Sequence, residues 1–333
     1  MRILVVGGAG YIGSHTSVVL AEAGHEVIIL DNFCNSSPTV SQRVTGLLGK
    51  PLKLIQADIR QIDSLAKIFS ENRIDAVFHF AGLKSVSESG AAPLNYYDNN
   101  VCGTVSLLRA MQEFGVRNIV FSSSATVYGN PVYLPYDEKH PTSPSNVYGR
   151  TKLHIEILMR DWAASNSGSS VSVLRYFNPV GSHHSGSLGD DPRGSSGNLM
   201  PYLINVLQGK YPKLIVFGND YETRDGTGER DYIHVMDLAR GHLAALDFLV
   251  EKTGFHVHNL GTGSGTTVLE LIRIFEDANS VTIPFEFGPR REGDLPSYYA
   301  AVEKSQIELG WSARLDLHQA CQDAFRFLQR GQL

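Results

Sequence analysis

The chain has 333 residues, of which 34 are acidic and 29 basic, so its formal net charge is −5. This mild acidity argues against a nucleic-acid-binding protein that works through a broad basic face. The apolar fraction of 42% and the charged fraction of 19% are ordinary for a globular protein and argue against fibrous and disordered classes.

Cysteine usage and the absence of long apolar runs set the expected compartment. Cys34, Cys102 and Cys321 are far apart and form no CxxC pair, so we expect neither a disulfide framework nor a zinc cluster. The apolar run at residues 2–6 is too short for a signal-peptide core, and no later stretch is long enough to span a bilayer. These features predict a soluble, cytoplasmic protein with reduced thiols.

The first half alternates short apolar runs, typical of buried parallel strands, with longer helical patterns. The predicted strands are Arg2–Val6, Glu26–Leu30, Lys53–Gln56, Ala76–Phe80, Asn118–Ser122 and Val171–Arg175. The predicted helices are Tyr11–Ala23, Ile62–Glu71, Pro93–Phe114 and Val147–Ser165. This alternation predicts an α/β fold with a Rossmann-like doubly wound parallel sheet.

The second half begins with a long polar loop at 178–198, and long loops in compact proteins tend to be functional. Further predicted elements are a helix at Leu199–Gln208, a strand at Leu214–Phe217, a helix at 235–250 and a strand at His256–Leu260. We therefore predict a Rossmann-like domain at 1–177, to which residues about 232–262 return, and a smaller mixed α/β domain at 178–333.

A glycine-rich segment joins the first predicted strand to the first predicted helix. It reads Gly-Gly-Ala-Gly-Tyr-Ile-Gly over residues 7–13 and contains GxGxxG. Between a strand and a helix, such glycines allow a tight turn and a close approach of the backbone to a pyrophosphate. Asp31 follows the second strand, where a carboxylate binds the adenosine ribose and disfavours a 2′-phosphate. We predict an NAD site that includes Gly7, Gly10, Tyr11, Ile12, Gly13 and Asp31.

Polar and small residues follow two further strands at the same expected sheet edge. Ligands of open α/β sheets bind beyond the carboxyl ends of the strands. Asp58 and Ile59 follow the third strand and fit the adenine end, although Asp58 taken alone is more typical of a strand-ending acid. Lys84 is placed to reach a phosphate. Asn99 lies on a helix, where a surface amide is nearly as good an interpretation as a cofactor contact. Further candidate contacts at this edge are Phe80, Ala81 and Gly82.

A second constellation combines a serine-rich strand end with a YxxxK pair. Tyr148 and Lys152 are four residues apart, which places phenol and ammonium on one helical face. The adjacent ammonium favours phenolate and makes Tyr148 a candidate general base. The hydroxyl of Ser124 could hold a substrate oxygen in line. A surface helix pair is the alternative, which the preceding dinucleotide motif disfavours.

These motifs together resemble the extended short-chain dehydrogenase/reductase family and, within it, the UDP-glucose (UDP-galactose) 4-epimerases. The segments that carry the resemblance include GGAGYIGSHT at 7–16, ILDNFCNS at 29–36, HFAGLKSV at 79–86, SSSATVYG at 122–129, YGRTK at 148–152, LRYFNPVG at 174–181, NLMPY at 198–202, FGNDY at 217–221, DGTGERDYIHVMDLA at 225–239 and PRREGDLPSYYA at 289–300.

The resemblance implies an isomerase of galactose metabolism that keeps NAD tightly bound. In such enzymes a base removes the proton of the sugar 4-hydroxyl while C4 is oxidised, the 4-keto sugar rotates, and hydride returns to the opposite face. It implies Tyr148, Lys152 and Ser124 as catalytic residues. It adds these cofactor contacts: Asn32, Asn35, Ser122 and Tyr176, besides Tyr148 and Lys152.

The same resemblance implies that the second half binds the UDP-sugar. The implied contacts are Lys84, Ser124, Thr126, Tyr148, Asn178, Asn198, Leu199, Val216, Phe217, Arg230, Arg291, Asp294 and Tyr298. The two arginines would clamp the diphosphate, which suits guanidinium geometry. A bulky Tyr298 implies restriction to glucose and galactose. The family also implies a homodimer formed by helices 93–114 and 147–165, although these helices could equally pack internally.

Several competing functions share parts of this pattern. A 4,6-dehydratase needs an acid–base pair where this chain has Ala125 and Thr126, and a decarboxylase would also need a Glu nearby. A UDP-glucuronate or UDP-N-acetylhexosamine 4-epimerase stays open as an alternative. A silent NAD-sensing regulator is disfavoured by the intact Tyr148 and Lys152. No metal is expected, because the pairs His183–His184 and His256/His258 lack a third ligand at a defined spacing.

Overall fold

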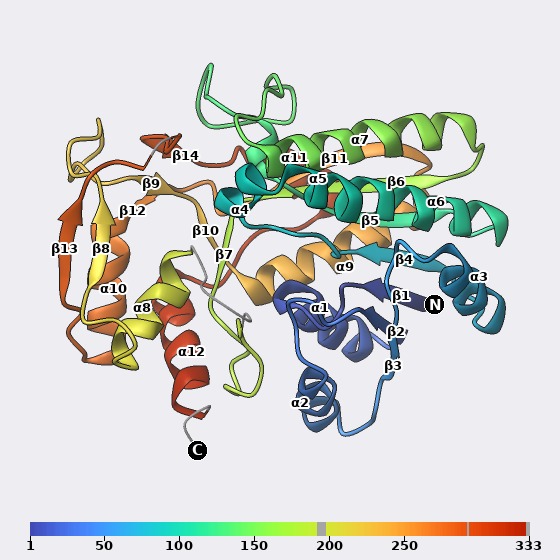
Figure 1. Cartoon of the computed structure of the whole chain (residues 1–333), viewed down its shortest axis with the longest axis horizontal. Coiled ribbons are helices and arrows are strands. Elements are labelled where there is room, and N and C mark those ends of the chain that lie inside the picture. Colours follow the sequence, from blue (N-terminus) through green and yellow to red (C-terminus); the bar gives the residue numbers. More distant parts are fainter. Residues whose placement is uncertain (192–197, 292, 331–333) are drawn as a thin grey trace.

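A seven-stranded parallel sheet forms the centre of the larger part of the molecule (Figure 1). The computed structural model describes residues 1–191, 198–291 and 293–330. The strand order is β11-β6-β5-β4-β1-β2-β3. The strands are β1 (Arg2–Val6), β2 (Glu26–Asp31), β3 (Lys53–Gln56), β4 (Ala76–His79), β5 (Asn118–Ser124), β6 (Ser170–Tyr176) and β11 (Gly254–Leu260). The predicted α/β class and doubly wound parallel sheet are confirmed.

Helices cover both faces of this sheet, which is why most of its strands are apolar throughout. One face packs against α1 (Tyr11–Glu22), α2 (Thr39–Leu48) and α9 (Val235–Glu251). The other face packs against α3 (Ile62–Glu71), α6 (Gly103–Glu113) and α7 (Val147–Ser165). The helix α2, which packs beside α1, falls in a stretch where the sequence predicted none, because only Val40 and Val44 of this helix are fully buried.

The single helix predicted at 93–114 is three consecutive pieces. These are α5 (Pro93–Tyr96), a π-helical turn η1 (Tyr97–Cys102) and α6. A short helix that the sequence did not predict, α4 (Val86–Ala91), precedes them and is capped by the Ser85 hydroxyl. Insertions of π-helix are frequent at functional sites. Here the insertion aims the side chain of Asn100 at the loop after β4, where it accepts from Leu83 N at 2.8 Å.

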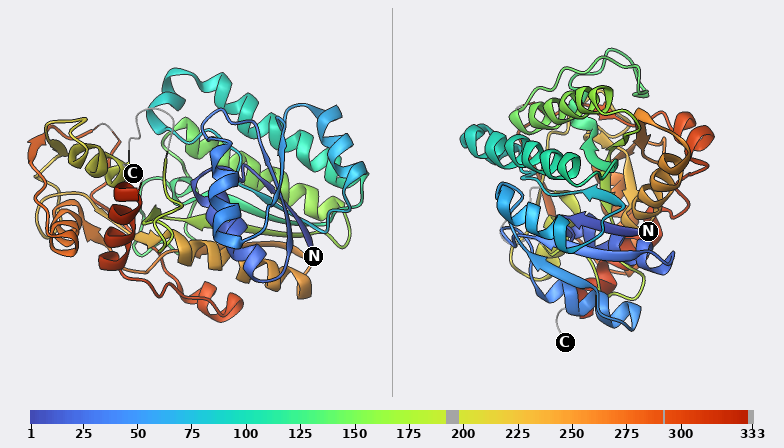
Figure 2. Two further views of the ribbon diagram at one scale, coloured as in Figure 1. Left: turned by 90° about the horizontal axis from the view of Figure 1, so that it is seen from below. Right: turned by 90° about the vertical axis from the view of Figure 1, so that its right-hand side faces the viewer.

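The C-terminal half builds a smaller part beside the main sheet (Figure 2). Its core lies between α8 (Leu199–Leu207), α10 (Val268–Asn279) and α12 (Leu317–Arg330). Short strand pairs surround this core: β7 (Asn178–Val180) with β10 (Tyr232–His234), and β8 (Leu214–Phe217) with β13 (Phe285–Gly288). A three-stranded group holds β9 (Glu229–Arg230), β12 (Thr266–Thr267) and β14 (Ser297–Tyr298), and α11 (Glu303–Leu309) packs near β11 and α9. A 3₁₀ turn, η2 (Ala125–Val127), follows β5.

The strand order reverses between β1 and β4, so the loops after these two strands part and leave a crevice at their carboxyl ends. Ligands of open α/β sheets bind at such a point. Within residues 1–191, 198–291 and 293–330, no helix is both long and apolar enough to cross a membrane.

Candidate active site

The loop between β1 and α1 is shaped by glycine. Gly7 has a left-handed φ of 76°, and a Cβ there would lie 2.5 Å from the backbone nitrogen of Ala81. A Cβ on Gly13 would lie 2.5 Å from the carbonyl oxygen of Gly7. No side chain caps the N-terminus of α1, so the first amide groups of this helix face the crevice. This arrangement makes an anion-binding cradle.

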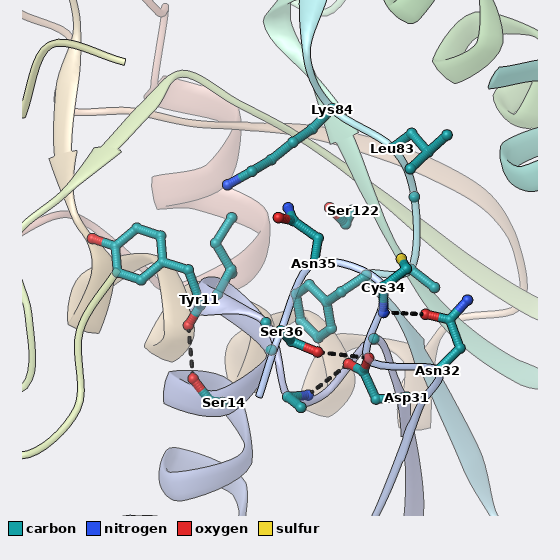
Figure 3. Close-up of a pocket in the computed structure, with 18 of the residues that line it drawn as sticks. Tyr11, Ser14, Asp31, Asn32, Cys34, Asn35, Ser36, Leu83, Lys84 and Ser122 are labelled. Atoms are coloured by element: carbon teal, nitrogen blue, oxygen red, sulfur yellow. Dashed lines mark hydrogen bonds between the residues drawn. The ribbon is translucent and has the colours of Figure 1, made fainter. Parts of the chain in front are cut away.

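The carboxylate of Asp31 organises the opposite wall of the cradle. It accepts hydrogen bonds from Ala9 N (3.0 Å), Phe33 N (2.9 Å) and Ser36 Oγ (2.8 Å), which fix the loop after β2 against the glycine loop (Figure 3). The side-chain Oδ1 of Asn32 accepts a hydrogen bond from Cys34 N at 3.0 Å. The acid predicted to select NAD therefore lies beside the phosphate cradle.

A long cavity runs from Asp31, past the glycine loop, to Tyr148 and Lys152. All the predicted cofactor contacts except one line this cavity. The predicted contacts that line it are Gly7, Gly10, Tyr11, Ile12, Gly13, Asp31, Asn32, Asn35, Ile59, Phe80, Ala81, Gly82, Lys84, Asn99, Ser122, Tyr148, Lys152 and Tyr176. The exception is Asp58. Arg60 binds its carboxylate at 2.9 and 2.8 Å and holds its pKa well below the usual range.

Two acids of the cavity wall were not predicted. Asp190 and Asp191 come from the loop after β7, which the sequence analysis predicted only as long and polar. Burial raises the pKa of Asp190, and the ammonium of Lys84 opposes that shift. Lys84 extends from the loop after β4 over the cavity (Figure 3). Loop length was the only signal in the sequence, because the position of these acids depends on tertiary packing.

The catalytic candidates meet where β5 ends and α7 begins. Asn146 caps α7 by accepting from Gly149 N at 2.8 Å. A Cβ on Gly149 would lie 2.9 Å from the carbonyl oxygen of Thr126, so only glycine lets this first helical turn approach β5 so closely. Ser124 Oγ accepts from Thr126 Oγ1 at 2.9 Å and shares a hydrogen bond with Tyr148.

Lys152 follows Tyr148 by one helical turn and is buried beneath it. Its Nζ donates to the carbonyl oxygen of Ser122 at 2.6 Å and lies 5.9 Å from the ring centroid of Tyr148. The hydroxyl of Tyr176 bonds to Ser122 Oγ on the same strand end. The pair that the YxxxK spacing predicted is therefore brought to the cofactor cavity and not to the protein surface.

Burial dominates the electrostatics of this pair. It raises the pKa of Tyr148 to about 12, while the Ser124 hydroxyl acts in the lowering direction. Burial also lowers the pKa of Lys152 to about 7, and the carboxylate of Glu156 acts in the raising direction. A positive charge near the phenol would favour its deprotonated form. The phenol is therefore placed to respond to any cation bound in the cavity.

A second cluster lies on the smaller part and meets the first at Tyr298. The Tyr298 hydroxyl donates to Asn178 Oδ1 at 2.6 Å, and the Arg230 guanidinium lies 4.7 Å from its ring centroid. Arg291 lies 4.8 Å from the ring centroid of Phe217. Asp294 lies between the arginines, 2.9 Å from Arg291 Nε and 3.9 Å from Arg230. The cluster offers two guanidinium groups and an aromatic face, which suit a diphosphate and a base.

Three remaining residues that were predicted to contact the UDP-sugar lie at α8 or in the core of the smaller part. Asn198 directly precedes α8, and Leu199 begins that helix and packs against the core of the smaller part. Val216 is buried in the same core. In the described ranges 1–191, 198–291 and 293–330, no group of three or more His, Cys, Asp or Glu side chains could hold a metal ion.

The family model for the NAD dependent epimerase/dehydratase family matches residues 3–261. The chain is also 50% identical to a UDP-glucose 4-epimerase of Bacillus subtilis over 327 residues, covering 98% of this chain and 96% of the relative. The chain belongs to the NAD dependent epimerase/dehydratase family. Another relative in this family, the UDP-glucose 4-epimerase of Bos taurus, is 49% identical. The alignment covers 99% of this chain and 97% of the bovine chain.

Solved structures of this epimerase family share the whole architecture. A UDP-glucose 4-epimerase of Stenotrophomonas maltophila with bound NAD and formylated UDP-arabinopyranose matches with a TM-score of 0.97 and 48% identity, over 100% of this chain and 99% of the other. A UDP-glucose 4-epimerase from Bifidobacterium longum in complex with NAD+ and UDP matches with a TM-score of 0.96 and 46% identity, over 100% of this chain and 99% of the other. The whole described fold therefore corresponds to that of these epimerases.

Proposed function

We propose that this chain interconverts UDP-galactose and UDP-glucose, using tightly bound NAD. The observation that carries the proposal is the Tyr148–Lys152 pair, buried at one end of a cavity whose other end has an uncapped helix N-terminus and Asp31. The similarity to UDP-glucose 4-epimerases over 98% of the chain supports the same activity.

The residues of the cavity fit NAD. Gly7 and Gly13 leave room for a pyrophosphate where any side chain would collide with backbone atoms, and the first turn of α1 supplies free amide groups. Asp31 is placed for the adenosine ribose, and its charge disfavours a 2′-phosphate. When bound there, NAD+ would supply the hydride acceptor for C4 of the sugar and then the hydride donor for the opposite face.

The chain's own residues handle the proton. Tyr148 takes the proton of the sugar 4-hydroxyl and later gives it back, while Ser124 holds the same oxygen through its hydroxyl. The Lys152 ammonium and the cationic nicotinamide both lower the pKa of the phenol, against the raising effect of burial. The phenol therefore gives up its proton most readily while the oxidised cofactor is bound.

The second cluster anchors the nucleotide while the sugar turns. Arg230 and Arg291 bind the diphosphate, Phe217 stacks on the uracil, and Asp294 contacts the ribose. Tyr298 lies between this anchor and Tyr148, so its ring limits the space at the sugar. We propose that this bulk restricts the enzyme to glucose and galactose.

The arrangement of the chain supports three further parts of the proposal. Residues 1–177, with about 232–262, form the NAD-binding unit, because β11 pairs with β6 in the main sheet; the rest of 178–333 binds the UDP-sugar. Two copies form a homodimer through the helical segments 93–114 and 147–165, which expose Leu94 and Ile157. The enzyme works in the cytoplasm, where the exposed thiols of Cys34 and Cys102 stay reduced.

The test is turnover without added cofactor. Purified protein is incubated with UDP-galactose alone, and UDP-glucose is measured by chromatography. We expect conversion without added NAD and NAD released on denaturation. UDP-N-acetylgalactosamine, run in parallel, should convert far more slowly because of Tyr298. No UDP-glucose, or a strict need for added NAD, would contradict the proposal.

A further inference from the structure

A buried carboxylate that the chemistry above does not use lies one helical turn beyond Lys152. Glu156 is on α7 and is only 3% exposed. Because Tyr148, Lys152 and Glu156 are spaced by four residues, their side chains share the face of α7 that packs on the sheet. Burying an isolated carboxylate costs free energy, so a buried Glu156 requires hydrogen-bond or ion-pair partners.

Two neighbouring strands bind this carboxylate. Arg175 on β6 donates from Nε to Oε1 at 3.1 Å and from its terminal nitrogen to Oε2 at 2.6 Å. Ser123 on β5 donates to Oε1 at 2.5 Å. Ser123 and Arg175 are register partners in the sheet, so one carboxylate joins α7, β5 and β6 at one level.

The strand residues on either side of this junction are the active-site residues. Ser122 accepts from Lys152 and Ser124 bonds to Tyr148, and both flank Ser123. Tyr176, which lines the cofactor cavity, directly follows Arg175. Any rotation of α7 that released Glu156 would therefore displace the phenol and the ammonium from their partners.

Besides Glu156, a carboxylate near the junction is that of Glu138, which interacts with Arg175. His79 on β4 faces Lys152, Tyr128 after η2 contacts Arg175, and Tyr176 on β6 lies near Tyr148. His79 is buried with its pKa lowered to about 3, so it stays neutral. Among these described groups, only Glu156 carries a negative charge toward Lys152.

We propose that Glu156 is a positioning residue of the epimerase reaction, which holds α7 in register with β5 and β6 and supplies the negative charge that Lys152 faces. The inference rests on the proposed function, because it assigns Glu156 a role through Lys152 and Tyr148. Its charge stabilises the ammonium, and its hydrogen bonds fix the helix.

The first experiment measures Lys152 directly, without turnover. In ¹³C-lysine-labelled holoenzyme, the ε-carbon resonance assigned by its loss in Lys152→Met is followed against pH. Because Glu156→Gln removes a negative charge, we expect the titration midpoint to fall by about one unit. Glu156→Asp keeps the charge but shortens the reach to Arg175, so its midpoint should stay near wild type while its melting temperature falls.

The second experiment compares pH profiles of kcat for UDP-galactose. The alkaline limb, where the ammonium is lost, should move to lower pH in Glu156→Gln and not in Glu156→Asp. Glu270→Gln is the matched control: it breaks a remote ion pair with Arg224 and should lower stability without moving either curve. A merely structural Glu156 would lower kcat equally at every pH.

Glu156→Gln leaves Arg175 buried without its partner, which can prevent folding. In that case the double variant Glu156→Gln/Arg175→Met, which has no unpaired charge, carries the same measurements, and its midpoint should still lie below wild type. Unchanged midpoints in these variants would overturn the inference. A wild type that does not convert UDP-galactose, but whose Lys152 midpoint follows Glu156, would refute the proposed function and not the link to Lys152.

Discussion

At the residue scale, the environment of Tyr148 is what makes an ordinary side chain a candidate base. Burial alone raises its pKa to about 12, which opposes deprotonation. Ser124 acts in the other direction, and a positive charge placed in the adjoining cavity would lower the phenol pKa further. The phenol therefore stays protonated near neutral pH in the free protein, and a positive charge bound in the cavity would make it easier to deprotonate.

Replacing Tyr148 by Phe tests this assignment. The variant keeps the ring that fills the site and loses the proton acceptor, so kcat should fall by roughly 10²- to 10⁴-fold. Bound NAD, measured after denaturation, should stay at the wild-type level. Tyr133→Phe is the control, because Tyr133 is exposed and donates only to Asp137. Wild-type turnover in Tyr148→Phe would rule out Tyr148 as the base.

At the element scale, the site depends on close approaches between loops and helices. Gly7 presses against the residue pair Phe80–Ala81 after β4, and Gly149 presses against Thr126 after β5. Each contact joins two elements whose carboxyl or amino ends line the cavity. The glycines thus determine how far the walls of the cavity stand apart.

Gly7→Ala should disrupt the cradle. Both the left-handed φ and the 2.5 Å approach to Ala81 N oppose a methyl group, so we expect a stability loss of ~1–3 kcal/mol and loss of bound NAD. Gly24→Ala is a matched control, since its φ is 87° but nothing lies within 4 Å of its Cβ position. Denaturant unfolding and cofactor content are measured for both. Equal losses of stability and of bound NAD in the two variants would show that the close approach of Gly7 to Ala81 is not what the glycine loop requires.

The sequence predicted the elements whose signals are local. Strands such as β1 and β3 were predicted with their observed bounds, because an apolar run between polar residues needs no tertiary information. The π-helical turn η1 was missed, because it depends on the hydrogen bonds of Asn100 with Leu83 and Thr151, which lie far away in the sequence. The helix α4 was missed because it spans only six residues.

The same distinction applies to the site. The glycine loop and the YxxxK pair were found because their chemistry lies within short segments. The cavity acid Asp190 was missed, since only the path of the loop after β7 brings it to the cavity. Glu156 carried a usable signal, its spacing of four from Lys152, but its partner Arg175 lies on the strand β6, 19 residues further along the chain.

At the scale of the whole molecule, the proposed function divides the binding of the two ligands between the two parts. The larger part, with the main sheet, contains the glycine loop and the Tyr148–Lys152 pair, and the smaller part contains Arg230 and Arg291. Tyr298 connects the two sets, because its hydroxyl bonds to Asn178 and its ring lies close enough to influence Tyr148. Reaction geometry therefore depends on how the smaller part sits against the main sheet.

The outer surface of the main part makes a prediction about assembly. Helices α6 and α7 pack one face on the sheet through residues such as Met111 and Met159. The adjoining α5 nevertheless exposes Leu94 (80%), α7 itself exposes Ile157 (38%), and the rings of Tyr97 in η1 and His154 on α7 pack together. Pairing these helices with those of a second copy would bury the exposed apolar side chains.

We therefore expect sedimentation equilibrium to give twice the 36.5 kDa of one chain. Ile157→Glu places a charge on the proposed interface and should shift the protein to monomers at micromolar concentration, because an unpaired charge opposes burial. Ile307→Glu is the control, since Ile307 is 82% exposed on α11, away from α5 and α7. A monomeric wild type, or an Ile157→Glu variant that stays dimeric, would show that these helices do not form the interface.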